Sequence, residues 1–172
     1  MTAIELIKQR LELVKKNLPV LPPNKFQVAE QEGRDLFSRW CLSLKMVPQF
    51  DNSIISAYDA YDAICNNNFY EIKYKKDQNI DSKMRLFENE GIMLEEQKML
   101  ALRAIWLLDP KKEFFYWMAF EDKTIIHKIN FEKNYKVRYK DCPTTTVGDK
   151  TIIAKRIYMI QLKDCSITPT IR

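Results

Sequence analysis

The stretch that decides the fold is residues 61–76, YDAICNNNFYEIKYKK, which has the pattern of a β-hairpin. Aromatic and β-branched residues stand on both sides of the pair Asn66-Asn67, and asparagine tolerates the positive φ angles that a two-residue turn requires. A turn centred on this pair brings together residues that are equally distant from it. The sequence therefore predicts that Asp62 lies directly across from Glu71.

The next acidic and basic positions of the hairpin predict a charged cluster. Glu71 and Lys73 are two residues apart, so they project from the same face of their strand. Two carboxyl groups at cross-strand distance repel each other, and a divalent cation would offset that repulsion. Hard carboxylate oxygens suit Mg²⁺ or Mn²⁺, and such an ion supports phosphodiester hydrolysis at neutral pH. The pattern predicts a metal-dependent phosphodiesterase.

Position in the hairpin, rather than the triplet itself, selects this site. The chain contains five acid-x-lysine triplets: Glu71/Lys73, Asp81/Lys83, Glu96/Lys98, Asp109/Lys111 and Glu121/Lys123. Only the first falls in a predicted strand with another acid across a hairpin. A longer turn would change the register and bring Asp59 into the place of Asp62. The plainer alternative is that these are exposed strand residues whose lysines form a solvated sheet edge.

With these residues in view, the chain resembles the PD-(D/E)XK nuclease superfamily, the fold of many restriction endonucleases, Holliday-junction resolvases and RecB-type exonucleases. The resemblance covers roughly residues 27–120, and Tyr61 stands where the motif has proline. It implies that Asp62 and Glu71 hold the metal together with the carbonyl of Ile72. It also implies that Lys73 orients or deprotonates the attacking water.

The resemblance extends to the helices on either side of the hairpin. A glutamate on the preceding helix often points at the same site in this family, and E-x-x-G-x-x-x-F from Glu30 to Phe37 fits that pattern, with Glu32 as second choice. A glutamine on the following helix is also frequent, and Gln97 stands in the expected place. Lys75 and Lys76 directly follow the site, and we expect these two lysines and Gln97 to contact nucleic acid.

The rest of the chain predicts two parts, an accessory helix with a proline-rich connector over residues 1–24 and a nuclease-like domain over 25–172. The domain is predicted to hold helices over 25–44 and 91–108, a loop over 77–89, and strands over 113–120, 124–131, 135–139 and 151–162, before an exposed tail from 166. This order predicts the α/β class, a single domain with a central mixed sheet flanked by helices. The resemblance makes that fold restriction-endonuclease-like.

The composition excludes several classes of function. With three glycines among 172 residues, no P-loop or G-x-G-x-x-G phosphate cradle can form. A single histidine removes multi-histidine metal sites, and four scattered cysteines without a C-x-x-C pair make a zinc site improbable. No apolar run is long enough to span a bilayer, and the first residues lack the pattern of a signal peptide. We expect a cytoplasmic protein with no membrane partner.

These observations predict a metal-dependent nuclease that hydrolyses phosphodiester bonds, with DNA and internal cleavage preferred. DNA against RNA, and endonuclease against exonuclease, stay open at this point. A substrate with two-fold symmetry would favour a homodimer. Two other classes are open: a non-catalytic nucleic-acid-binding or accessory protein on the same fold, and an interaction protein that assembles through its first helix.

Overall fold

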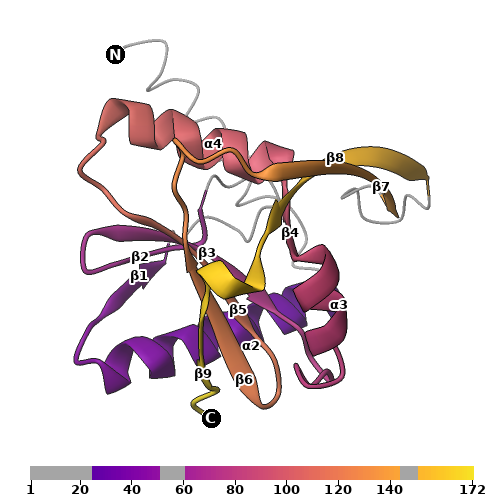
Figure 1. The fold of residues 1–172 in the computed structure, drawn as a ribbon. Helices are drawn as coiled ribbons and strands as arrows, with labels where there is room; N and C mark the ends of the chain where they lie inside the picture. Colours follow the sequence, from indigo (N-terminus) through magenta and orange to yellow (C-terminus); the bar gives the residue numbers. More distant parts are fainter. Residues whose placement is uncertain (1–24, 51–60, 144–150) are drawn as a thin grey trace, which may run out of the picture.

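The structure is a computed structural model that describes residues 25–50, 61–143 and 151–172 (Figure 1). The predicted accessory helix and connector, residues 1–24, lie outside the described residues, and so does Asp59. The elements are α2 (Lys25–Ser43), β1 (Pro48–Phe50), β2 (Ala63–Cys65), β3 (Asn68–Tyr74), α3 (Met84–Glu90), β4 (Ile92–Glu95), α4 (Glu96–Leu108), β5 (Phe114–Ala119), β6 (Lys123–Lys128), β7 (Lys136–Pro143), β8 (Ile152–Ile160), a short 3₁₀ turn (Leu162–Asp164) and β9 (Ser166–Pro169).

The strands form two sheets. The larger has six strands in the order β1-β2-β3-β5-β6-β9, and the smaller has three in the order β4-β8-β7. Within the larger sheet β3 and β5 run parallel while their neighbours are antiparallel, so the sheet is mixed. Figure 1 shows α2 on one side of this sheet and α4 on the other. The predicted α/β class, with a mixed sheet flanked by helices, is confirmed.

The predicted hairpin forms with the predicted turn. Asn66 and Asn67 take φ angles of 48° and 65°, which are the two positive values that this tight turn needs. Cys65 pairs with Asn68 and Ala63 pairs with Tyr70, so the register is the one expected from a turn centred on the asparagines. The register is confirmed as far as Ala63, where β2 ends.

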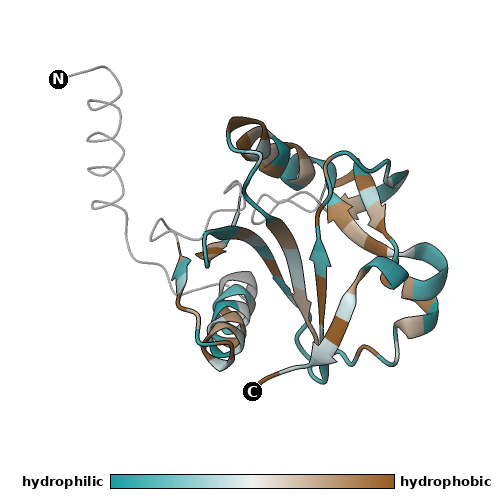
Figure 2. Ribbon diagram, turned by 60° about the vertical axis from the view of Figure 1, so that its left-hand side comes forward, coloured by the Kyte–Doolittle hydropathy of each residue, from teal (hydrophilic) through white to brown (hydrophobic). Residues whose placement is uncertain are grey.

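Two hydrophobic cores lie on opposite faces of the larger sheet because side chains alternate along its strands. On one face Phe37 of α2 packs edge-on against Trp117, with ring centroids 5.4 Å apart. On the other face Leu102 of α4 belongs to the same buried cluster as Phe114 and Tyr116. Figure 2 shows apolar residues along the strands between the two long helices. No described helix combines the length and apolar character that crossing a membrane requires.

A glycine brings α2 close to the strand that carries the predicted site. A Cβ placed on Gly33 would lie 3.0 Å from Cβ of Tyr74 and 3.7 Å from Cγ2 of Ile72. Real Cβ atoms rarely approach that closely, so the helix packs here at a distance that only glycine allows. This contact fixes where the first turns of α2 lie relative to the end of β3.

Three predicted segments differ from the structure. The predicted loop over 77–89 contains α3, in which Met84 and Phe87 share a face and pack against the core. The predicted helix from Gly91 begins only at Glu96, because Ile92 and Leu94 alternate as the strand β4. The predicted tail contains β9, which pairs with β6 along four residues.

Among the described residues, both outermost strands of the larger sheet contain proline. β1 starts at Pro48, and β9 has four residues and ends at Pro169. Proline has no backbone N–H, so it cannot donate to a further strand. Edge strands of this kind are how native sheets discourage continued pairing.

Candidate active site

All of the predicted site residues except Lys76 line one cavity of about 760 Å³. Glu30 comes from α2, Asp62 from the residue before β2, and Glu71 and Lys73 from β3. Helix α4, strands β4 and β5, and the β7–β8 ribbon complete the walls. The structure therefore brings together three carboxyl groups and a lysine from separate segments of the chain.

Asp62 is held in place where the hairpin ladder ends. It is only 5% exposed, and its backbone N–H donates to the carbonyl of Tyr70 over 2.8 Å. Its Oδ2 accepts a 2.7 Å hydrogen bond from the backbone N–H of Ile72. The side chain thus replaces the ladder partner that β2 no longer supplies to Ile72. This hydrogen bond fixes the orientation of the Asp62 carboxylate at the cavity.

Glu71 is buried on the same face of the sheet as the α4 core. It is 5% exposed, and burial raises its pKa to about 8, with the negative charge of Asp62 adding to the rise. The positive charges of Lys98 and Lys73 pull its pKa the other way without overcoming burial. The carboxyl therefore carries a proton in much of the population at neutral pH when no cation is bound.

Lys98 of α4 is a site residue that the sequence prediction missed. Its Nζ lies 2.9 Å from Oε2 of Glu71, so the two side chains form an ion pair. The prediction had set aside the Glu96/Lys98 triplet because it falls on a helix. A signal was available, since Lys98 stands four residues before the buried Leu102 and so shares its helix face.

The two candidate glutamates of α2 have different surroundings. Glu30 lines the cavity, and burial followed by the charge of Asp62 raises its pKa. Glu32 instead pairs with Lys76 at 2.7 Å, and neither of these two residues lines the cavity. The geometry thus favours Glu30 over Glu32, and it places Lys76 away from the other predicted residues.

The remaining predicted contacts, Lys75 and Gln97, also line the cavity. Lys75 is partly buried, and burial together with the charges of three neighbouring lysines lowers its pKa. Gln97 is exposed, next to Lys98 on α4. Lys73 is exposed as well, so its ammonium can meet a ligand that enters the cavity.

The carboxylate oxygens of this cavity suit Mg²⁺ better than Zn²⁺. The described residues contain no group of three His, Cys, Asp or Glu side chains placed to hold a metal ion. Such a set does not fit a zinc cage, which needs four protein ligands. Mg²⁺ keeps several waters and binds through one or two carboxylates, which is the kind of ligand that Asp62 and Glu71 could offer. The ammonium of Lys98 already lies 2.9 Å from Oε2 of Glu71, so a cation bound at this carboxyl would share it with Lys98.

Comparisons with known proteins found no matching family model, no matching curated protein and no matching solved structure.

Proposed function

We propose that this chain is a metal-dependent nuclease that hydrolyses phosphodiester bonds in nucleic acid, with DNA as the substrate and internal cleavage as the expected mode. The cofactor we expect is Mg²⁺, with Mn²⁺ able to replace it. The observation that carries the proposal is the convergence of Asp62, Glu71 and Lys73 on one cavity, two of them as buried carboxyl groups. Burying two acids side by side is costly unless the site serves a cation.

The chain's own residues divide the chemistry between them. Asp62, oriented by the N–H of Ile72, and Glu71 supply the anionic oxygens, and the Ile72 carbonyl is a further donor. A divalent cation held there would supply Lewis-acid stabilisation of the charge that develops at phosphorus. Lys73, two residues along β3, is placed to hold a phosphate oxygen and to accept or orient the proton of the attacking water.

The fold supports the same proposal at the level of resemblance. Glu71 and Lys73 sit on β3, inside the mixed sheet, and Asp62 lies just before the neighbouring strand β2, with α2 on one face of the sheet and α4 on the other. Glu30 and Gly33 keep the helix spacing that the PD-(D/E)XK resemblance implies, and Gly33 lies against β3. We therefore propose the restriction-endonuclease-like fold as the finer classification of this α/β domain.

One observation favours a second candidate, a non-catalytic nucleic-acid-binding protein on the same fold. Lys98 stands 2.9 Å from Glu71 and supplies a positive charge where a cation would otherwise be needed. In a protein of that class the acids and Lys98 would form a structural cluster only. Calorimetry with Mn²⁺ separates the two candidates, because the nuclease requires binding that Asp62→Asn removes.

Cleavage of supercoiled plasmid in Mg²⁺, Mn²⁺ or EDTA tests the proposal. We expect metal-dependent nicking that falls by at least about 10²–10³-fold in Glu71→Gln and in Lys73→Ala, the usual cost of one well-placed group. Lys111→Ala is the matched control, since Lys111 belongs to another acid-x-lysine triplet and is exposed away from the cavity. Wild-type rates in both site variants would refute the proposal.

A further inference from the structure

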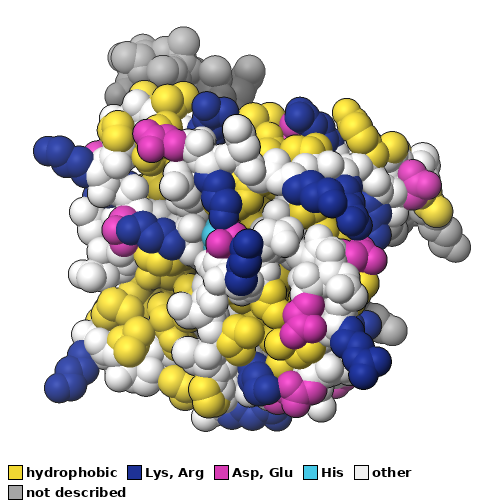
Figure 3. Space-filling model, in the orientation of Figure 1, with side chains coloured by type: hydrophobic (Ala, Val, Ile, Leu, Met, Phe, Trp, Pro, Cys, Tyr) yellow, Lys and Arg dark blue, Asp and Glu magenta, His cyan; other side chains and the backbone are white. Residues whose placement is uncertain are grey.

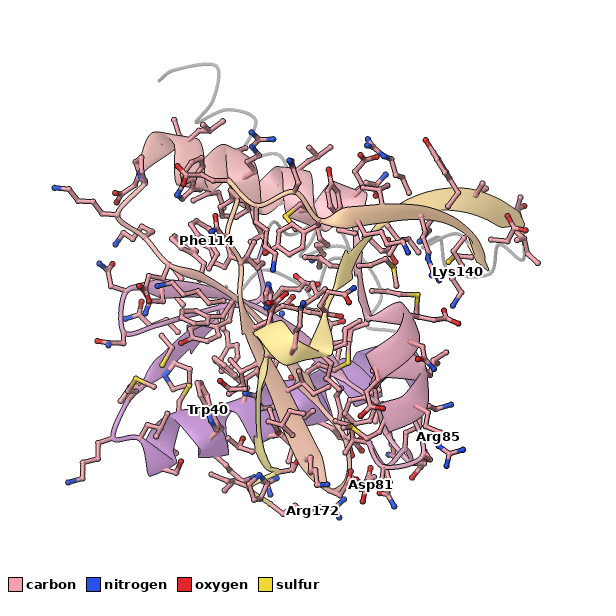
Figure 4. All side chains as sticks on the ribbon, in the orientation of Figure 1. Trp40, Asp81, Arg85, Phe114, Lys140 and Arg172 are labelled. Carbon is pink, nitrogen blue, oxygen red and sulfur yellow. The ribbon has the colours of Figure 1, made fainter. Side chains whose placement is uncertain are left out.

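Beyond the acidic group, the same cavity has a basic end built by parts of the chain far apart in sequence. Lys75 follows β3, Lys83 caps the start of α3, and Lys140 comes from β7. Figure 4 labels Lys140 where β7 passes above α3. Lys73 lies between this basic end and Glu71 along the line of β3. Lys73, Lys75, Lys83 and Lys140 therefore all line the same cavity.

These lysines lack acidic partners, in contrast to others in the protein. Within the described ranges, no carboxylate lies within ion-pair distance of Lys73, Lys75, Lys83 or Lys140. Six other lysines of the same ranges are ion-paired: Lys76, Lys98, Lys123, Lys128, Lys133 and Lys155. The Nζ of Lys140 contacts the sulfur of Met93 at 3.4 Å. Among the described residues, this end of the cavity therefore concentrates lysines that form no ion pair.

The electrostatics of Lys75 show that the four ammonium groups act on one another. Burial lowers the pKa of Lys75, and the charges of Lys73, Lys140 and Lys83 lower it further. Like charges held together at a partly buried position are unfavourable unless an anion joins them. Figure 3 shows further Lys and Arg side chains gathered where the β7–β8 ribbon leaves the N-terminal end of α4.

The spacing matches a chain of phosphates better than a single one. Lys75 is four positions after Glu71, which is about 13 Å along a strand. Consecutive phosphates of one strand lie roughly twice as far apart as their 3.4 Å rise along the duplex axis, so about two or three phosphates span that length. A phosphate at the acidic end and its successors at the lysines would therefore occupy the cavity together.

We propose that Lys75, Lys83 and Lys140 hold the phosphate backbone of the nucleic-acid strand on one side of the cleaved bond, between α3 and the β7–β8 ribbon. This inference rests on the proposed function and names the part of the substrate that the cavity grips. It makes the substrate a polynucleotide rather than a short phosphodiester, because the grip needs several consecutive phosphates. The contacts are to phosphate and so are independent of base sequence.

The test measures binding of a fluorescein-labelled DNA oligonucleotide by anisotropy in EDTA, over a series of KCl concentrations. The variant is Lys83→Gln with Lys140→Gln, and the control is Lys111→Gln with Lys163→Gln, which removes two exposed charges outside the cavity. We expect the site variant to bind several-fold more weakly. Its slope of log affinity against log salt should be shallower by about 0.7–0.9 for each lost contact.

The two double variants must differ for the inference to stand, with equal thermal midpoints showing that both are folded. Equal affinity and equal salt slopes would overturn it, whether or not the wild-type protein cleaves DNA. Failure of the nuclease proposal is distinguishable, because it would appear as absent cleavage in every metal while the binding difference persists in EDTA.

Discussion

Replacing Glu71 with glutamine should make the protein more stable at neutral pH, although it removes a central group of the site. Burial and the charge of Asp62 raise the pKa of Glu71 to about 8, from an ordinary value of 4.5. The folded state thus holds a proton that the unfolded state releases. This group favours folding most below pH 4.5, and its contribution is lost as the pH rises toward 8. Glutamine keeps the shape of the protonated side chain without titrating.

The size of the effect follows from that pKa. Each pH unit between the unfolded and folded pKa values costs about 1.4 kcal/mol of stability. At pH 7 the loss from Glu71 is therefore about 3 kcal/mol relative to acidic solution. Most single substitutions destabilise a protein by about 1 kcal/mol, so a stabilising change of this size would stand out.

Urea unfolding in EDTA, followed by tryptophan fluorescence at several pH values, measures the effect. The free energy of unfolding of the wild type should fall below that of Glu71→Gln as the pH rises, and the gap should reach about 3 kcal/mol near pH 7. Glu113→Gln is a control that makes the same substitution at an exposed ion pair outside the cavity. A constant difference between wild type and Glu71→Gln across this pH range would refute the burial argument.

Two further substitutions test the packing and the charges around the site. Gly33→Ala should lower the free energy of unfolding by about 1 kcal/mol, measured by thermal unfolding. Overpacking costs about 1–3 kcal/mol, and alanine regains only about 1 kcal/mol through its higher helix propensity. A higher melting temperature would contradict the close contact with Tyr74. Lys98→Met should raise the pKa of Glu71 by about one unit or more, since Lys98 holds that pKa down. The pH range over which the free energy of unfolding falls, measured in EDTA, should then extend upward, and an unchanged range would mean that Lys98 does not act on Glu71.

The parts of the fold that the sequence predicted are those set by local rules. The turn at Asn66-Asn67 depends on φ angles that few residues tolerate, and the pairing on either side follows from counting outward. Glu71 and Lys73 then share a face because a strand alternates. The cavity that gathers them with Glu30 also depends on Gly33, a residue whose spacing the prediction had noted.

The errors occurred where tertiary contacts decide. Gly91 takes a φ of 88° against the Ile160 carbonyl of β8, a conformation that does not start a helix, so Ile92 and Leu94 become a strand. Residues Ser166–Pro169 form a strand because they pair with the free edge of β6, and no local sequence pattern predicts that pairing. Lys98 was missed for the same reason, since only the packing of α4 on the sheet turns it toward Glu71.

The prolines in the outermost described strands β1 and β9 limit one way in which two copies of this protein could associate. If one subunit added its outermost strand of the larger sheet to that of the next, Pro48 and Pro169 would have no backbone N–H to donate to the shared ladder. The same two prolines disfavour fibril growth by strand addition at these edges.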